Sequence, residues 1–543
     1  MSYWIKPKSF FFSKKQQILL LLFTVLIWCA LVSPIGYLFE AFIDGFSNNF
    51  LESIRIEFWG MLKTTLLLSA MVLVGSTLIA AAQNLIYFNL EMKWKKIAHV
   101  IFLLPLALPA YVLAFIFVGA IGTGSPLETF LFNSYHSIHK ILPLQDSIFL
   151  AALSLSIVLS PYMYMNLRLG FAGIPDSILE SASLLSTKSF VHINKIYIPL
   201  LFPWWKQASI LILLECFADF GAVSIFHVET FSTGIYKHWF ALFSLESARE
   251  LSSLVILGVF GLILALRMAQ FKKWQISGRV RLQRKIKLSK TIKLILYPIV
   301  FLASFFGVAF PFSQLLVWAM DVSGGILFGF EYISNTLSLS FLALIFSSIV
   351  ALAFLYLCRF NRSKLVGLLN ESVQLGYGIP GTILAVAIYY PFSHLDRWIA
   401  NLINLDSGWL SGGVFITVIG LSFRFFKVMY QPLYGYFTSL NYNIEENASL
   451  LDPSRWNIVR KIHLPLLWPV YLSSSILFLV DCFKEMPIQL MTRSFGWDTL
   501  SIKIYEYTSE GEWERAAALS LVLVALGLVP IFLLARREHE SPA

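Results

Sequence analysis

Residues 180–203 read ESASLLSTKSFVHINKIYIPLLFP, and residues 446–469 repeat this stretch, 266 positions later, as ENASLLDPSRWNIVRKIHLPLLWP. The two copies agree at 11 of 24 positions without a gap. Roughly two matches are expected by chance at this composition, so the stretches are copies of an internal repeat. Each copy is polar and lies between two long apolar segments. We therefore predict a chain built from two similar halves.

Within each copy, small and apolar residues recur at helical spacing. Ala182 and Leu185 lie three positions apart, as do Ala448 and Leu451, which places each pair on one face of a short amphipathic helix at the membrane surface. Proline at the first turn of a helix loses no hydrogen bond that would have formed, so Pro199 and Pro465 are predicted to begin spanning helices. An ordinary interfacial loop is the alternative interpretation.

The composition is that of a polytopic membrane protein. Hydrophobic residues make up 57% of the 543 residues and charged residues 13%, against roughly 45–50% and 25% in soluble domains. About twelve apolar runs are long enough to cross roughly 30 Å of hydrocarbon as α-helices. The runs are continuous rather than alternating, which excludes a β-barrel. The predicted spans are 18–42, 60–83, 98–122, 148–171, 198–225, 252–271, 292–319, 333–358, 363–390, 413–435, 466–490 and 515–535.

The predicted fold class is thus all-α, with six spanning helices in each half. We place the first half at residues 1–270 and the second at 291–543, joined by a basic linker at 271–290. A solvated linker next to the membrane is the favoured interpretation of this basic run, with contact to anionic lipid or a ribosome as the alternative. Glycines and prolines inside two of the spans can break a helix or serve close helix packing: Pro105, Pro109, Gly376, Gly378, Pro380 and Gly381.

The net charge of +10 sets orientation and does not indicate nucleic-acid binding. Positively charged loops remain on the cytoplasmic side, and lysines precede the first span at Lys6, Lys8, Lys14 and Lys15. Because the apolar run that follows is longer than the core of a signal peptide, it is predicted to be an uncleaved span. Both termini and both repeat loops are therefore expected in the cytoplasm.

A second matched cluster carries the charges expected at membrane depth. Glu215-Cys216-Phe217-Ala218-Asp219 corresponds to Asp481-Cys482-Phe483-Lys484-Glu485, again at an offset of 266. Residues four apart share a helix face, and the first acid lies about 24 Å from the cytoplasmic helix end at 1.5 Å per residue. We predict that Glu215, Asp219, Asp481 and Glu485 ring the outer mouth of a translocation pathway. The alternative is that they are end groups solvated by water outside the membrane.

The repeated loop resembles the Glu-Ala-Ala loop of ABC importer permeases, whose short helix docks into a cleft of a cytoplasmic ATPase. The resemblance implies that the loops couple the permease to that ATPase, and that the fold is that of a type I ABC importer permease. The family's glycine is replaced here by Ser186 and Asp452. The residues implied in coupling are Glu180, Ala182, Ser186, Pro199, Glu446, Ala448, Asp452 and Pro465.

Further stretches resemble the ferric iron permease family over nearly the whole chain. They are Leu214–Val223, Thr233–Tyr236, Trp239-Phe240, Val480-Asp481, Lys484–Pro487, Trp497–Leu500 and Ala516-Ala517. The resemblance implies a bacterial inner-membrane importer of ferric iron. Its implied partners are two copies of an ABC ATPase, which would use ATP and Mg, and a periplasmic or surface substrate-binding protein. Thiamine, aminoethylphosphonate, polyamines and sulfate are alternative cargoes for related permeases.

The motifs of enzymes and of nucleotide binding are missing from the sequence. It contains no Gly-Lys pair and therefore no phosphate-binding P-loop, so hydrolysis is expected in a separate subunit. We expect no cofactor and no protein-bound metal, because the four cysteines and nine histidines show no ligand spacing. An ion-driven secondary transporter is disfavoured by the parallel repeat. A membrane-embedded enzyme lacks a nucleophile and base at a membrane surface.

Overall fold

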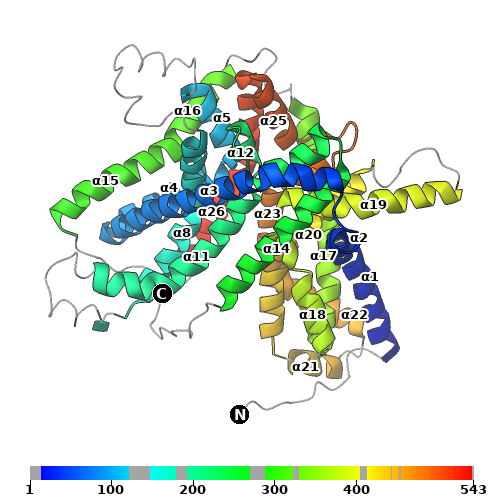
Figure 1. Ribbon diagram of the computed structural model, residues 1–543. Helices are drawn as coiled ribbons and strands as arrows, with labels where there is room; N and C mark the ends of the chain where they lie inside the picture. The colour runs from blue at the N-terminus through cyan, green and yellow to red at the C-terminus, as the bar shows by residue number, and fades with distance from the viewer. Residues whose placement is uncertain are drawn as a thin grey trace. The chain divides into compact units, whose positions relative to one another are not determined.

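The computed structural model describes residues 14–121, 147–175, 177–178, 181, 193–268, 288–320, 322, 329–361, 363–403, 412–441, 443–451 and 454–540. Helices and short turns make up these ranges, and none of them contains a β-strand. Figure 1 shows the helices and their labels. Contacts between them divide the chain into two compact units, each assembled from segments that are distant in the sequence.

The first unit consists of residues 1–47, 243–253 and 331–499. The long helices α20 and α23 pack against each other, and α1 from the chain's beginning packs on α19. Trp28 of α1 donates a hydrogen bond from Nε1 to Ser372 Oγ at 2.6 Å. The helices of this unit are α1 (Lys14–Leu38), α2 (Ala41–Asp44), the start of α14 (Leu245–Met268), α17 (Phe330–Phe360), α18 (Lys364–Ser372), η6 (Leu375–Gly378), α19 (Gly381–Ile403), α20 (Val414–Ser439), α21 (Asn443–Leu451), α22 (Arg455–Ile458), η7 (Val459–His463), α23 (Leu464–Lys484) and α24 (Pro487–Met491).

The second unit consists of residues 48–242, 254–330 and 500–543. Its centre is the packing of α8 against α3 and α11, and α26 from the chain's end packs on α16 and α25. Phe115, Trp318 and Trp513 stack with ring centroids 6.1 to 6.5 Å apart and join three helices. The helices are α3 (Asn48–Asn89), α4 (Met92–Leu103), η1 (Leu104–Ala107), α5 (Ala110–Ile121), α8 (Ser147–Gly173), η2 (Ile193–Tyr197), α11 (Ile198–Ala218), α12 (Gly221–Ile225), α13 (Phe231–Tyr236), η3 (Lys237–Ala241), the rest of α14, α15 (Lys290–Ser304), η4 (Phe305–Ala309), α16 (Phe310–Met320), α25 (Leu500–Glu510) and α26 (Trp513–Glu540).

The sequence repeat is also present in the order and register of the helices. A π-helical turn, a long helix and a short helix follow each other as η2, α11 and α12, and again as η7, α23 and α24, every pair at an offset of 266. Pro199 and Pro465 stand in the first turn of α11 and α23, as predicted. Proline cannot donate the backbone hydrogen bond that would continue a regular helix from the preceding residues. In both halves the wider π-turn directly precedes the helix that the proline begins.

Eight helices are long and apolar enough to cross a membrane, and two bent helix pairs raise the number to ten among the described residues. The predicted count of twelve is thus not confirmed. The remaining predicted spans, 252–271 and 515–535, overlap α14 and α26. The two bends, of 86° and 119°, lie at 107–110 and 378–381, where the sequence places Pro109, Pro380 and Gly381. The 271–290 linker lies mostly outside the described residues, and the division into halves at 270 and 291 stays a prediction.

Candidate functional site: the repeat loops and the helix breaks

The second repeat loop contains the short helix α21, whose two faces differ in exposure. Ala448 is buried, and so is Glu445, one turn earlier. Glu446 faces outward, together with Leu450, which is 84% exposed. Helix α21 therefore binds the bundle through one face and leaves a mixed acidic and apolar face uncovered. Asp452 lies outside the described residues.

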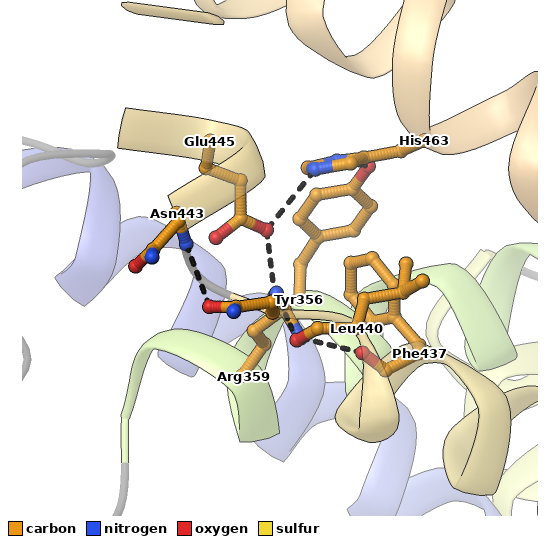
Figure 2. Close-up of polar contacts among 8 residues, drawn as sticks. Tyr356, Arg359, Phe437, Leu440, Asn443, Glu445 and His463 are labelled. Atoms are coloured by element: carbon orange, nitrogen blue, oxygen red, sulfur yellow. Dashed lines mark hydrogen bonds and ion pairs between the residues drawn. The ribbon is translucent and has the colours of Figure 1, made fainter. Parts of the chain in front are cut away.

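A buried arginine holds this helix in place. Arg359, in the last turn of α17, is 1% exposed, and its Nε donates to Glu445 Oε1 at 2.6 Å. Its two terminal nitrogens donate to backbone carbonyls at the end of α20, Nη1 to Phe437 and Nη2 to Leu440 at 3.1 Å. Figure 2 shows the guanidinium between these three acceptors. One side chain thus links α17, the end of α20 and α21.

A histidine and a tyrosine complete the cluster from neighbouring helices. His463 Nε2 lies 3.1 Å from Glu445 Oε1, and His463 Nδ1 lies 2.9 Å from the Tyr356 hydroxyl. Burial by itself raises the pKa of Glu445, but the hydrogen bonds from His463 and Arg359 outweigh it and hold that pKa below its ordinary value. The Glu445 carboxylate is therefore charged at neutral pH, in a place from which water is largely excluded.

The first repeat loop is described only in part. Glu180, Ala182 and Ser186 lie outside the described residues, and Pro199 is exposed at the start of α11. The coupling role of both loops is therefore still a prediction.

The predicted membrane acids lie at matching helix breaks. Asp219 and Glu485 are the residues at which α11 and α23 end. Asp219 Oδ1 accepts hydrogen bonds from the backbone N–H groups of Ala222 and Val223 at 3.1 and 3.2 Å. The Glu485 carboxylate accepts from Ile488 at 3.0 Å and from Gln489 at 3.3 Å. Both carboxylates thus cap the short helix that follows, an anchoring function that the sequence prediction did not include.

The other two acids of the predicted ring, Glu215 and Asp481, lie within the last turn of α11 and α23 and are partly buried. Beyond the end of α11 the second unit encloses a cavity of about 230 Å³. Lys237 lies in its wall and contacts Glu57 at 2.9 Å and Glu229 at 3.9 Å. In the described part of the chain, no group of three or more His, Cys, Asp or Glu side chains could hold a metal ion.

Sequence reasoning missed Arg359, Glu445, His463 and Tyr356. A signal was available for two of them. Arg359 is the charge that ends a long apolar run, and Glu445 stands next to the predicted coupling glutamate. The histidine and the tyrosine carry no such signal, because they contact each other across 107 residues of sequence.

The described residues thus form long apolar helices with matching helix breaks in the two halves, and the second half also presents a short surface helix, α21. Residues 343–537 match the family of inner membrane components of binding-protein-dependent transport systems. Members of this family are permease subunits that work with a substrate-binding protein, so the chain is a transport subunit of the ABC type and not an enzyme.

Similarity to known permeases extends beyond this range. The chain is 24% identical to the Fe(3+)-transport system permease protein FbpB 2 of Haemophilus influenzae over 87% of this chain and 89% of that protein. It is 27% identical to the maltose/maltodextrin permease MalG of Escherichia coli over 35% of this chain and 62% of MalG. A candidate 2-aminoethylphosphonate permease, PhnV of Salmonella typhimurium, is 37% identical over 17% of this chain and 36% of its own length.

Proposed function

We propose that this chain is the fused permease of an ATP-driven importer of ferric iron in a bacterial inner membrane. The observation that carries the cargo is the extent of similarity to the Haemophilus iron permease, which covers both halves of the chain. The similarities to the maltose and aminoethylphosphonate permeases cover 35% and 17% of the chain. Aminoethylphosphonate is the second candidate cargo, because that shorter match has the higher identity.

In this proposal both termini lie in the cytoplasm, and two copies of a cytoplasmic ABC ATPase dock on the loops 180–203 and 446–469. The exposed face of α21 supports such docking. It presents Glu446 beside the 84%-exposed Leu450, and an apolar side chain uncovered next to charged groups is typical of a protein interface. Closure of the ATPases would push these loops and move the helices that begin at Pro199 and Pro465. The substrate-binding protein would deliver iron on the opposite side, where the acids at the helix breaks would line the entrance.

Uptake of radiolabelled ferric iron by iron-starved cells tests both parts of the proposal. The deletion strain would carry the wild-type chain, Glu180→Lys with Glu446→Lys, or Glu510→Lys. The last is a matched control, because Glu510 is an exposed glutamate at the end of α25, outside the sequence of both loops. We expect the wild type and the control to restore uptake, and the double variant to insert normally but fail.

Two outcomes would contradict separate parts. If deletion leaves iron uptake unchanged, iron is the wrong cargo, and the same strains would then be tested with 2-aminoethylphosphonate. If the double variant transports iron as the wild type does, the two glutamates do not couple the permease to its ATPase.

A further inference from the structure

The place where the repeat loop meets the bundle is built differently in the two halves. Phe437 and His463 of the second half correspond to Phe171 and Tyr197 at the offset of 266, and Arg359 corresponds to Phe88 at the offset of 271. In the first half these positions form an aromatic cluster. Phe88 and Phe171 have ring centroids 5.5 Å apart, and Phe171 and Tyr197 have theirs 5.3 Å apart. Glu445 itself corresponds to Leu179.

In the second half, two of these matched positions themselves carry the ionisable side chains Arg359 and His463. Arg359 lies over the Phe437 ring at 4.7 Å from its centroid and donates to Glu445, whose carboxylate is also approached by His463. Charge-assisted hydrogen bonds are directional and are lost when donor and acceptor separate by about 1 Å. Aromatic contacts tolerate sliding over similar distances at small cost, because dispersion attraction is spread over many atom pairs.

The helices that this cluster joins are less closely packed farther along. An apolar cavity of about 180 Å³ lies among α17, α20 and α23, lined by Leu352, Leu355, Leu433, Leu467 and Tyr471. Native helix interfaces rarely leave a space of this size. The three helices are thus fixed to each other at the end that carries α21 and have room to shift beyond it.

We propose that Arg359, Glu445 and His463 form an ionic latch that makes α21 move as one body with α17, α20 and α23. At the matching positions of the first half, Phe88, Phe171 and Tyr197 are in aromatic contact instead, and such contacts can slide. Arg359 is then a positioning residue that passes ATPase movement into the second half's helices. This inference rests on the coupling role proposed for the loop, and it adds that the two loops transmit movement unequally.

The test uses the full complex of permease, ATPase and binding protein, purified in lipid nanodiscs. Backbone hydrogen exchange is measured for α21 and for α17, with and without a non-hydrolysable ATP analogue. In the wild type we expect the analogue to change exchange in both helices. In Arg359→Met the change should remain in α21 and fall about tenfold in α17, within the range usual for coupled sites. A residue that served stability alone would alter exchange equally with and without nucleotide.

Two further variants keep the test decisive. The triple variant Arg359→Phe, Glu445→Leu, His463→Tyr copies the first half's residues and leaves no buried charge, so it should fold even if Arg359→Met does not. It should show the same loss of transmission. Arg397→Met is the control, because Arg397 is an exposed arginine of α19 in the same unit, and it should behave as the wild type does. Undiminished transmission to α17 in the triple variant would overturn the latch.

The same preparations separate this inference from the proposed function. ATP hydrolysed per ferric ion transported should rise about tenfold in the triple variant, again within the usual range of coupling. If the wild type transports no iron, the cargo proposal fails, while the exchange measurement still decides the latch because it needs no cargo. If the ATP analogue changes hydrogen exchange in neither helix of the wild type, the loop is not a coupling element and the latch proposal is wrong as well.

Discussion

Asp219 and Glu485, 266 residues apart in the sequence, end their spanning helices in the same way. Each has a helical φ and an extended ψ of 125°. Each carboxylate accepts hydrogen bonds from backbone N–H groups of the next short helix. The surroundings of the two differ. A Cβ added at Gly381 would touch both the Glu485 carboxylate and the Arg424 guanidinium, whereas the position that corresponds to Arg424 is Val158. Glu485 thus lies near an arginine at a position where the first half carries a valine.

Removing the carboxylate should therefore cost more in the second half. Asp219→Ala loses a helix cap, worth about 1 kcal/mol. Glu485→Ala loses the cap and also leaves Arg424 without its acidic neighbour, which brings the cost to about 3 kcal/mol by analogy with broken buried pairs. Thermal unfolding in detergent, followed by tryptophan fluorescence, measures both variants. Equal destabilisation would show that Arg424 adds nothing to the anchoring at Glu485.

The elements that the sequence predicted well are those governed by local chemistry. The repeat, the prolines that open α11 and α23, and the breaks near Pro109 and Pro380 follow from backbone restrictions that act within a few residues. Each of these can be read from a short window of the sequence, because no distant partner is needed to fix it.

Long-range packing could not be predicted in the same way. Arg249 of α14 lies 3.8 Å from Glu40 and 3.7 Å from Asp44, two hundred residues earlier, and this contact joins the α2 segment to a unit made mostly of later residues. The Arg359 cluster similarly depends on how α17, α20 and α21 meet. Hydropathy and spacing carry no information on such partners. The capping role of Asp219 and Glu485 is local, with partners three and four residues ahead, and it was missed because these acids were interpreted as groups of a pathway mouth.

Gly376 should be intolerant of even the smallest side chain. It lies in η6 at the second helix break, where a Cβ would collide with the backbone carbonyl of Phe423 in α20. A backbone atom of a packed helix cannot move aside cheaply, so Gly376→Ala should cost about 1 to 3 kcal/mol through overpacking and reduce the yield of folded protein.

Gly435 provides the matched control for this prediction. It lies within α20, and a Cβ there would meet nothing within 4 Å. Gly435→Ala should be neutral or stabilising by roughly 0.5–1 kcal/mol, because alanine loses less conformational freedom in a helix than glycine. Size-exclusion profiles and melting temperatures of both variants decide the matter. A Gly376→Ala protein as stable as Gly435→Ala would mean that η6 can shift away from α20.

The aromatic stack of the second unit should be a major source of its stability. Trp513 of α26 contacts Phe115 of α5 and Trp318 of α16, so its ring joins helices from both ends of the sequence. Trp513→Ala should destabilise the protein by about 3–5 kcal/mol, the usual cost of truncating a packed aromatic residue. Trp468→Ala is the control, because that ring is 55% exposed, and it should cost much less. A similar loss in both variants would contradict the prediction.

Acid should weaken the attachment of α21 through Glu445. Its folded-state pKa is lowered, because the hydrogen bonds from His463 and Arg359 outweigh the effect of burial. A group with a lowered pKa contributes stability that is present above its unfolded pKa, about 4.3 for glutamate, and is lost as the pH falls through the folded pKa. The contribution should thus be constant from pH 7 to about 5.5 and decline below about pH 4.5.

Unfolding measured from pH 7 to pH 4 should therefore show a smaller acid-induced loss of stability in Glu445→Gln, which cannot titrate, than in the wild type. Glu446→Gln, at the exposed neighbouring position, should follow the wild-type curve. If Glu445→Gln follows it as well, the carboxylate does not contribute to stability through these contacts.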